Sequence, residues 1–229
     1  MSKILVLITS VIKPSSNPLS YSIVRSVYSS EQRLQQTMNT FKSIRDLLPQ
    51  ADIMVCECSP LTPEEIEIFE KNTDYFINLY GTKYQAGTCA YSKAAGEGAQ
   101  TIAAAETIFQ TGMNEQYSAI IKISGRYWFN ESFQSALWGS NEYPNIANTP
   151  STGANETTST VAYKLSLKNF QQFANYLKTH TAEIDACVAF ETLFHRFFQD
   201  IQEQYNNNHL VSSLGVCGFC AVDGTFYRN

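Results

Sequence analysis

The stretch KILVLITS, residues Lys3–Ser10, decides the fold of this chain. Its apolar run, Ile4–Ile8, is followed by two small polar residues, Thr9 and Ser10. An apolar run without alternation is typical of a strand buried on both faces of a parallel sheet. Three later stretches have the same character, and we expect them to be strands as well: Asp52–Cys58, Tyr75–Tyr80 and Ala119–Ser124.

Helical patterns separate these strands. Ser29 and Gln32 form a capping box, and apolar residues recur at helical spacing from there to Pro49. A second helix starts at Thr62, which is followed by a proline and then by two glutamates. A third helix is expected over Ser92–Thr111. Strands that alternate with helices in this way predict an α/β fold with a parallel sheet.

The second half of the chain is less regular. Asn148–Thr160 is a polar stretch that predicts a mobile loop, a candidate lid over a bound ligand. Around it we expect further helices and strands: Phe133–Leu137, Val161–Leu165, Lys168–Thr179, Ile184–Gln204 and Leu214–Val222. We therefore predict one domain over residues 1–229, with a mostly parallel central sheet in an α/β/α sandwich.

Composition limits the function. The chain has 229 residues and a formal charge of −5, and only 16% of its residues are charged, where about 25% is usual. Uncharged polar side chains suit hydrogen-bonding partners such as sugars, whereas an acidic chain without a basic run is not expected to bind nucleic acid. The run Ile4–Ile8 is too short for a signal peptide or a transmembrane segment, so we expect a cytoplasmic location.

The cysteines allow two interpretations. Cys56 and Cys58, together with Cys217 and Cys220, could form a zinc site of four thiolates. The alternative, which we favour, is that they are small core residues, because both stretches are apolar.

Ligands of open parallel sheets bind beyond the carboxyl ends of the strands. Thr9 and Ser10 end the first strand. Arg25 and Arg33 flank the amino end of the first helix, where an arginine opposes the helix dipole unless an anion lies there too. They indicate either a phosphate-bearing ligand or ordinary solvated arginines.

Lys93 lies in the first turn of the helix that precedes the fourth strand, and Gly96 and Gly98 follow it closely. This arrangement suits a diphosphate, because the glycines let a ligand approach the backbone. It is not a Walker motif, and the chain has no Gly-x-Gly-x-x-Gly after a strand, which weighs against a dinucleotide-dependent dehydrogenase.

The fourth strand ends in Ser124, Gly125, Arg126, Tyr127 and Trp128. The arginine can hold phosphate oxygens in a fork, and either aromatic ring can stack on a base or a sugar. The alternative is a β-turn followed by core aromatic residues.

Glu191 and His195 are four residues apart, so they share one face of a helix that is rich in phenylalanine. Apolar surroundings would raise the pKa of the carboxylate, which suits a general base. The alternative is a pair on the helix surface. Glu183 and Asp185 could instead chelate a metal. No serine- or cysteine-nucleophile signature is present.

Several of these motifs together resemble a group of small glycosyltransferase-like proteins from bacterial surface-polysaccharide clusters and from large DNA viruses of algae. The resemblance rests on Leu7–Ser10, Arg25–Tyr28, Glu31–Thr37, Ser43–Arg45, Glu57–Ser59 and, most specifically, Lys122–Tyr127, which reads Lys-x-Ser-Gly-Arg-Tyr. It spans most of the chain, as far as Gly215–Gly224. Such proteins are similar to the GT-A fold, a nucleotide-sugar-binding α/β domain.

The resemblance implies that a hexose is moved from a nucleoside-diphosphate sugar, a UDP-sugar such as UDP-glucose, to a glycan hydroxyl in polysaccharide biosynthesis. Residues 1–128 would bind the nucleotide and residues 129–229 the acceptor. Glu191 would be the catalytic base of an inverting reaction, or would orient the donor in a retaining one. The expected binding residues comprise nucleotide-lining Thr9 and Ser10, diphosphate-facing Arg25, Arg33, Lys93 and Arg126, ring-packing Tyr127 or Trp128, and Ser124, Gly125 and His195.

This chain departs from the family at one point. GT-A enzymes carry an Asp-x-Asp that holds Mn²⁺ or Mg²⁺ against the diphosphate, whereas this chain has Ser124–Arg126 in that place and no Asp-x-Asp anywhere. Either the basic residues offset the charge of the leaving group without a metal, or a carboxylate elsewhere holds the metal together with the phosphates. We favour the first.

Two other functions are compatible with the same residues. One is a non-catalytic nucleotide-sugar- or glycan-binding module of a larger polysaccharide-building protein. The other is a structural α/β protein without a ligand.

Overall fold

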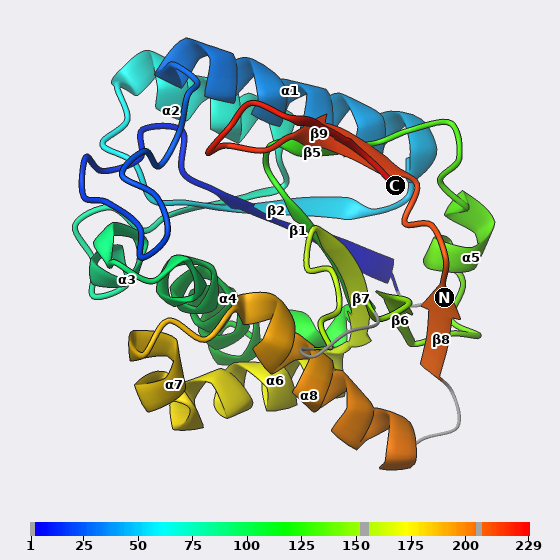
Figure 1. Ribbon diagram of the computed structural model, residues 1–229. Helices are drawn as coiled ribbons and strands as arrows, with labels where there is room; N and C mark the ends of the chain where they lie inside the picture. Colours follow the sequence, from blue (N-terminus) through cyan, green and yellow to red (C-terminus); the bar gives the residue numbers. More distant parts are fainter. Residues whose placement is uncertain (1–2, 152–155, 205–207) are drawn as a thin grey trace.

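The computed structural model describes residues 3–151, 156–204 and 208–229. It has a seven-stranded central sheet with helices on both faces (Figure 1). In spatial order the strands are β3 (Tyr75–Asn78), β2 (Asp52–Glu57), β1 (Lys3–Ser10), β4 (Tyr117–Ser124), β7 (Ala162–Ser166), β6 (Asn145–Asn148) and β8 (Asn208–Val211). The first four run parallel, β7 is antiparallel to both of its neighbours, and β6 pairs in parallel with β8. The predicted mostly parallel α/β/α sandwich is confirmed.

The apolar run of β1 fills two cores at once. Leu5 and Leu7 pack in the apolar cluster on one face of the sheet, and Val6 and Ile8 pack in the cluster on the other. All four side chains are fully buried. Because side chains alternate along a strand, only a continuous apolar run can serve both faces.

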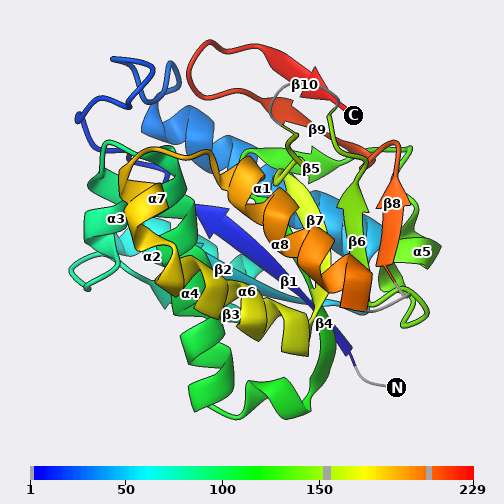
Figure 2. The same cartoon turned by 60° about the horizontal axis from the view of Figure 1, so that its bottom comes forward.

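Two layers of helices cover the sheet. One layer consists of α1 (Ser30–Leu47) and α2 (Pro63–Asn72), and both begin with the capping boxes that the sequence predicts. The other layer consists of α4 (Lys93–Gln110), α6 (Leu167–Thr179) and α8 (Phe190–Gln204), which lie in front of the sheet in Figure 2. Short helices connect the elements: α3 (Gln85–Cys89), α5 (Ser135–Gly139), α7 (Thr181–Asp185) and the 3₁₀ turn Met113–Glu115. None of the helices in the described part of the chain is long and apolar enough to cross a membrane.

A second, three-stranded antiparallel sheet lies against α1. Its order is β10 (Phe226–Arg228), β9 (Val216–Phe219) and β5 (Tyr127–Phe129). Hydrogen bonds join it to α1, because Thr40 Oγ1 of the helix donates to the carbonyl of Tyr127, and the backbone N–H of Phe129 donates to Ser43 Oγ. The chain therefore leaves the central sheet at the end of β4 and enters the second sheet within three residues.

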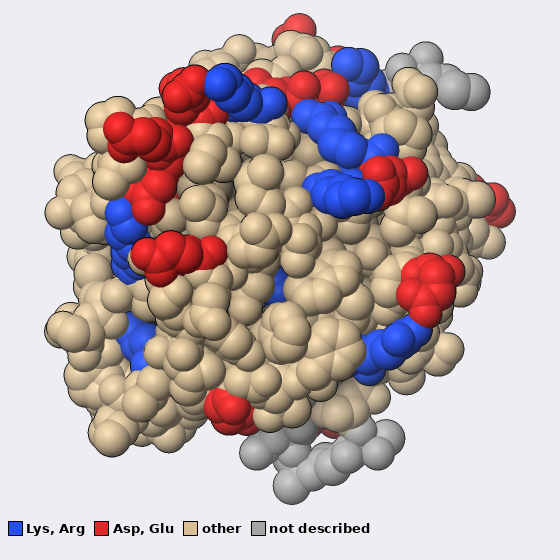
Figure 3. All heavy atoms as spheres, turned by 90° about the horizontal axis from the view of Figure 1, so that it is seen from above, with Lys and Arg blue, Asp and Glu red and all other residues tan. Residues whose placement is uncertain are grey.

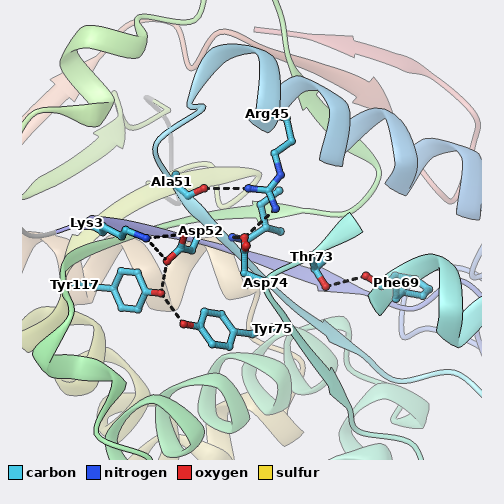
Figure 4. A network of polar contacts seen from close by, with 10 residues as sticks. Lys3, Arg45, Ala51, Asp52, Phe69, Thr73, Asp74, Tyr75 and Tyr117 are labelled. Carbon is cyan, nitrogen blue, oxygen red and sulfur yellow. Dashed lines mark hydrogen bonds and ion pairs between the residues drawn. The ribbon is translucent and has the colours of Figure 1, made fainter. Parts of the chain in front are cut away.

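The amino ends of the parallel strands are closed by polar contacts (Figure 4). The Tyr117 hydroxyl donates to the carboxylate of Asp52 at 2.6 Å, Lys3 forms an ion pair with the same carboxylate, and the hydroxyls of Tyr117 and Tyr75 are 3.0 Å apart. Beside them Asp74 accepts from the backbone of Ile53 and from Arg45. The carboxyl ends of the same strands are where a cavity opens.

Several element predictions need correction. The expected helix Ile184–Gln204 is interrupted between α7 and α8, where Cys187 has a φ of 63°. The expected closing strand Leu214–Val222 is shorter and belongs to the second sheet. The helix expected over Phe133–Leu137 lies two residues later. The segments β5, β6, β8, β10 and α3 were not expected. Residues 152–155, the middle of the expected lid Asn148–Thr160, lie outside the described residues.

Candidate functional site

A cavity of about 410 Å³ opens at the carboxyl ends of β1 and β4. It is bounded by these two strands, by the first two turns of α4, by the loop between β1 and α1, and by the segment 220–223 that follows β9. Nine of the predicted site residues line it: Thr9, Ser10, Arg25, Arg33, Lys93, Ser124, Gly125, Arg126 and Tyr127. Three others, Trp128, Glu191 and His195, do not.

Gly125 makes the turn from the central sheet toward the cavity. Its N–H donates to the carbonyl of Thr9 at 2.9 Å, and its own carbonyl accepts from Thr37 Oγ1 at 2.8 Å. A Cβ at this position would lie 3.2 Å from Cβ of Ser10 and 3.3 Å from Cγ2 of Ile8, which is tighter than ordinary packing. The absence of a side chain therefore lets β4 pass close to β1 before Arg126.

Arg126 is the least engaged of the cavity's arginines. One of its terminal nitrogens donates to the carbonyl of Phe219 at 2.9 Å, and the guanidinium lies 5.6 Å from the centre of the Tyr127 ring. No described carboxylate lies within ion-pair distance of it. Its side chain is half-buried, so a partly desolvated positive charge faces the cavity without a carboxylate to offset it.

Lys93 brings a second positive charge from the other side of the cavity. It is the first residue of α4, and its Nζ lies 3.9 Å from Oε1 of Glu191. Burial lowers the pKa of Lys93, but the neighbouring carboxylates of Glu191 and Glu97 outweigh that effect and leave the pKa raised. The preceding residue, Ser92, occupies the N-cap position but makes no capping bond with its side chain. The amino end of α4 therefore offers backbone N–H groups and the positive end of the helix dipole beside a lysine.

Arg25 and Arg33 also hold the backbone around the cavity. Each nitrogen of the Arg25 guanidinium donates to a backbone carbonyl, of Asn17, Thr88 or Ala90. These three hydrogen bonds hold the loop between β1 and α1 against the end of α3, so Arg25 shapes the cavity wall.

Arg33 is almost fully buried and donates to the carbonyl of Val11 and to Ser26 Oγ. Burial, together with the nearby charge of Arg126, lowers the pKa of Arg33 to about 9, although Glu57 opposes this. Both arginines line the cavity, and each of their side-chain nitrogens already donates one hydrogen bond within the protein.

A buried ion pair that sequence reasoning missed lies at the cavity floor. Lys122 of β4 is fully buried, and its ammonium contacts the carboxylate of Glu97, the hydroxyl of Ser124 at 2.9 Å and the carbonyl of Thr160 at 2.7 Å. Burial lowers the pKa of Lys122, and the Glu97 carboxylate opposes this. A lysine inside the apolar run Ile121–Ile123 was the available signal, since a buried charge needs a partner. Glu97 is therefore paired with Lys122 and forms no ion pair with Arg126.

Trp128 and His195 lie elsewhere. Trp128 packs against other aromatic side chains of the second sheet. Its ring centre lies 5.7 Å from that of Phe219 and 6.4 Å from that of Phe226. His195 is buried, with Nδ1 3.0 Å from Thr158 Oγ1 and Nε2 3.2 Å from the carboxylate of Glu156. The histidine holds the end of the polar loop against α8.

The apolar surroundings expected around the Glu191 carboxylate are not found. The neighbouring phenylalanines of α8 turn into the core, whereas the side chain of Glu191 is one-third exposed. Its carboxylate faces Lys93 and lies 3.4 Å from the hydroxyl of Thr160. Glu191 lines a second, smaller cavity that also includes Lys93.

The described residues contain no cluster of three metal-ligating side chains. Over residues 3–151, 156–204 and 208–229, no group of three or more His, Cys, Asp or Glu side chains could hold an ion. Of the two carboxylates in the cavity lining, Glu97 is paired with Lys122, and Asp223 accepts from the backbone N–H of Thr225.

The other expected metal ligands are also separate. Cys56 and Cys58 pack in the core of the central sheet, while Cys217 lies in the second sheet, so the zinc interpretation is not supported. Glu183 pairs with Arg196 at 2.6 Å.

Comparison with known proteins does not identify the family of this chain. No protein-family model matches this sequence, and no curated protein matches it. Among solved structures, one similar chain is from Desulfovibrio desulfuricans G20 and is provisionally described as a nucleotide-diphospho-sugar transferase. The two share 10% sequence identity and a TM-score of 0.49 over 92% of this chain and 80% of that chain. A similarity of this size identifies no activity, so the function has to be argued from the cavity.

Proposed function

We propose that this protein is a GT-A-like glycosyltransferase that moves a hexose from a nucleoside-diphosphate sugar, a UDP-sugar such as UDP-glucose, to a glycan hydroxyl. One observation carries the proposal. Arg126, from the end of β4, and Lys93, from the start of α4, line one cavity together with an amino helix end that lacks a side-chain cap. A role in polysaccharide biosynthesis and a viral origin, which the resemblance implies, belong to the same proposal. So does a cytoplasmic location.

A diphosphate matches this arrangement physically. Backbone N–H groups and the dipole at a helix start favour an anion, and an arginine fork binds phosphate oxygens in two places. The cavity volume of about 410 Å³ lies within the range of about 300–1,000 Å³ that is usual for small-molecule sites. Thr9, Ser10 and Ser124 at the strand ends add hydroxyl groups for a ribose or a phosphate.

The transfer would use the same charges. The acceptor hydroxyl oxygen forms a bond to the anomeric carbon of the hexose, and the bond from that carbon to the phosphate oxygen breaks. The electron pair of the broken bond leaves with the nucleoside diphosphate, whose growing negative charge Arg126 and Lys93 stabilise. If the configuration inverts, Glu191 accepts the hydroxyl proton. In a retaining reaction Glu191 orients the donor instead, and the departing phosphate oxygen accepts the hydroxyl proton.

We propose further that side-chain cations, rather than Mn²⁺ or Mg²⁺, offset the charge of the diphosphate. The ion pair between Glu97 and Lys122 supports this, because a metal bound to the Glu97 carboxylate would compete with the buried ammonium of Lys122.

The test combines binding and turnover. The protein is incubated with labelled UDP-glucose and GDP-glucose and a panel of glycan acceptors, and release of nucleoside diphosphate is measured. In parallel, UDP binding is measured for the wild type and for Arg126→Gln. Loss of a charged hydrogen bond should weaken UDP binding about 10- to 100-fold. The matched control is Arg228→Gln, an exposed arginine of β10 that pairs with Glu131.

Each result has a distinct meaning. Equal UDP affinity in Arg126→Gln and in the wild type would contradict the assigned site. No binding of UDP, GDP or their sugars would contradict the function. Donor binding without turnover across the panel would favour the non-catalytic binding module.

A further inference from the structure

A second cavity, of about 200 Å³, adjoins the first. Tyr21 and Lys93 line both cavities, so ligands in the two would lie against the same side chains. The rest of its wall comes from Ser20, from the start of α4 and from residues 187–191, which lead into and begin α8. Nothing in the proposed binding of the nucleotide uses this space.

The wall of this second cavity contains a polar group without a partner. Ser92 is only 4% exposed, and its hydroxyl has no hydrogen-bond partner among the described residues. Although Ser92 stands at the N-cap of α4, its side chain does not cap the helix. A buried hydroxyl without a partner costs free energy, and a bound ligand could supply the missing hydrogen bond.

The wall also contains an unusual backbone. Cys187 is the only non-glycine residue with a positive φ in the described part of the chain. Hydrogen bonds from its own N–H to Ile184 and from the N–H of Val188 to Glu183, each 3.0 Å long, hold this conformation. Such conformations are uncommon and concentrate at ligand sites. Here the conformation ends α7 and turns the chain along the cavity into α8.

The chemistry of the lining selects a neutral ligand rich in hydroxyl groups. The carboxylate of Glu191 would repel an anion but can accept hydrogen bonds from hydroxyls, and Lys93 can donate to them. Tyr21 is 61% exposed, and its ring offers an apolar face with a polar hydroxyl at the tip.

We propose that the second cavity binds a sugar unit of the acceptor, with Glu191 and Ser92 hydrogen-bonded to its hydroxyls and Tyr21 packed against its ring. The proposal rests on the glycosyltransferase function proposed above. It deepens that function, because it assigns the acceptor to a cavity that shares Lys93 and Tyr21 with the donor.

Three half-buried cysteines allow ligand binding in each of the two cavities to be measured separately. Cys187 lines the second cavity, Cys220 lines the first, and Cys89 lines neither. The wild-type protein is alkylated with iodoacetamide, and the rate at each cysteine is followed by mass spectrometry of its peptides. The probes are UDP, methyl α-glucoside and lactose, and each sugar is added with and without UDP.

We expect UDP to slow alkylation of Cys220 and at least one of the sugars to slow alkylation of Cys187. At a ligand concentration about ten times Kd, the rate should fall about tenfold, since only the free protein reacts. The rate at Cys89 should not change. Isothermal titration calorimetry with the same sugars provides a measurement that does not depend on the thiols.

Variants then test the assigned contacts. Glu191→Gln and Ser92→Ala should each weaken sugar binding by about 3- to 10-fold, in line with a lost hydrogen bond. Glu183→Gln is the matched control, because its carboxylate lies on the neighbouring helix, pairs with Arg196 and does not line the cavity.

The outcomes separate the two proposals. If UDP protects Cys220 and neither sugar binds or protects Cys187, the second cavity is not the acceptor site, and the proposed function stands. Equal protection of all three cysteines by a sugar would also contradict the proposal that the second cavity binds the sugar. If a sugar protects Cys187 while UDP does not protect Cys220, the second cavity binds sugar and the assigned donor site is wrong.

Discussion

Gly215 stands where another part of the backbone leaves no room for a side chain. It has a φ of 66°, and a Cβ there would overlap the backbone of Phe133. Gly112 has a similar φ of 75° but open space around it. The pair separates the two reasons for a glycine, a left-handed backbone and a close approach.

We expect Gly112→Ala to lower the free energy of unfolding by about 1–2 kcal/mol, the cost of the left-handed conformation. Gly215→Ala should cost about 1–3 kcal/mol more, because Phe133 has to move as well. Urea unfolding of both variants measures the difference. Equal losses would show that the contact with Phe133 is relaxed at no cost.

Lys164 is a second residue whose properties, here its pKa, depend on its surroundings in the fold. It lies fully buried in β7, where its ammonium donates to the carbonyl of Ser140. Burial lowers the pKa of Lys164 from 10.5 to about 8. Between these two pH values the unfolded chain holds a proton that the folded protein has lost, so Lys164 makes the free energy of unfolding rise with pH.

We therefore expect the wild type to gain stability relative to Lys164→Met as the pH rises from 8 to 10.5. Below pH 8 the difference between the two proteins should be constant, because Lys164 is then protonated in both states. Urea unfolding at a series of pH values provides the measurement. Parallel pH profiles of the two proteins would show that the lysine is not perturbed.

At the scale of elements, the helix starts differ in a way that predicts function. Ser29 and Thr62 form complete capping boxes at α1 and α2, whereas Ser92 at α4 makes no capping bond. Arg33 in the first turn of α1 also lines the first cavity, but the capping residues Ser29 and Thr62 line neither cavity. The uncapped helix begins between the two cavities.

Ser29→Ala should lower the free energy of unfolding by about 1 kcal/mol, the usual contribution of an N-cap. We expect Ser92→Ala to change it by less than half as much, because the hydroxyl makes no hydrogen bond in the folded protein. Thermal and urea unfolding of both variants test this. A loss in Ser92→Ala as large as in Ser29→Ala would mean that Ser92 does cap α4.

The break between α7 and α8 shows why element boundaries were harder to predict than elements. The apolar spacing over Ile184–Gln204 is compatible with one helix. The chain instead turns at Cys187, a residue type that rarely adopts a positive φ and so left no signal in the sequence. By contrast, capping boxes and buried strands depend on residues close in sequence, and these predictions agree with the structure.

At the scale of the whole molecule, the cavity is assembled from parts of the chain that are far apart in sequence. The two sheets, α4 and the segment 220–223 meet there. Figure 3 shows the molecule from above: basic side chains lie beside acidic ones, and most of this face is uncharged. Arg126, by contrast, has no described carboxylate within ion-pair distance.

From this charge arrangement we expect UDP to raise the midpoint of thermal unfolding in the presence of EDTA. Adding Mn²⁺ should increase the shift little if, as we propose, Arg126 and Lys93 offset the charge of the diphosphate. A ligand that binds only the folded state raises its stability as RT ln(1 + [L]/Kd), about 2.7 kcal/mol at 100 times Kd. A shift seen only with Mn²⁺ would show that a metal joins the protein to the phosphates.

The sequence by itself determined the α/β class, the buried strands, the capped helices and the group of basic and small residues at the strand ends. These depend on periodicity and on local hydrogen bonds, which neighbouring residues encode. Only the tertiary structure decided that Arg25 and Arg33 hold a loop, that Lys122 neutralises Glu97, and that Trp128 and His195 lie away from the cavity. The partners in these contacts are brought together by packing between elements, and no spacing along the chain records which partner a buried charge will find.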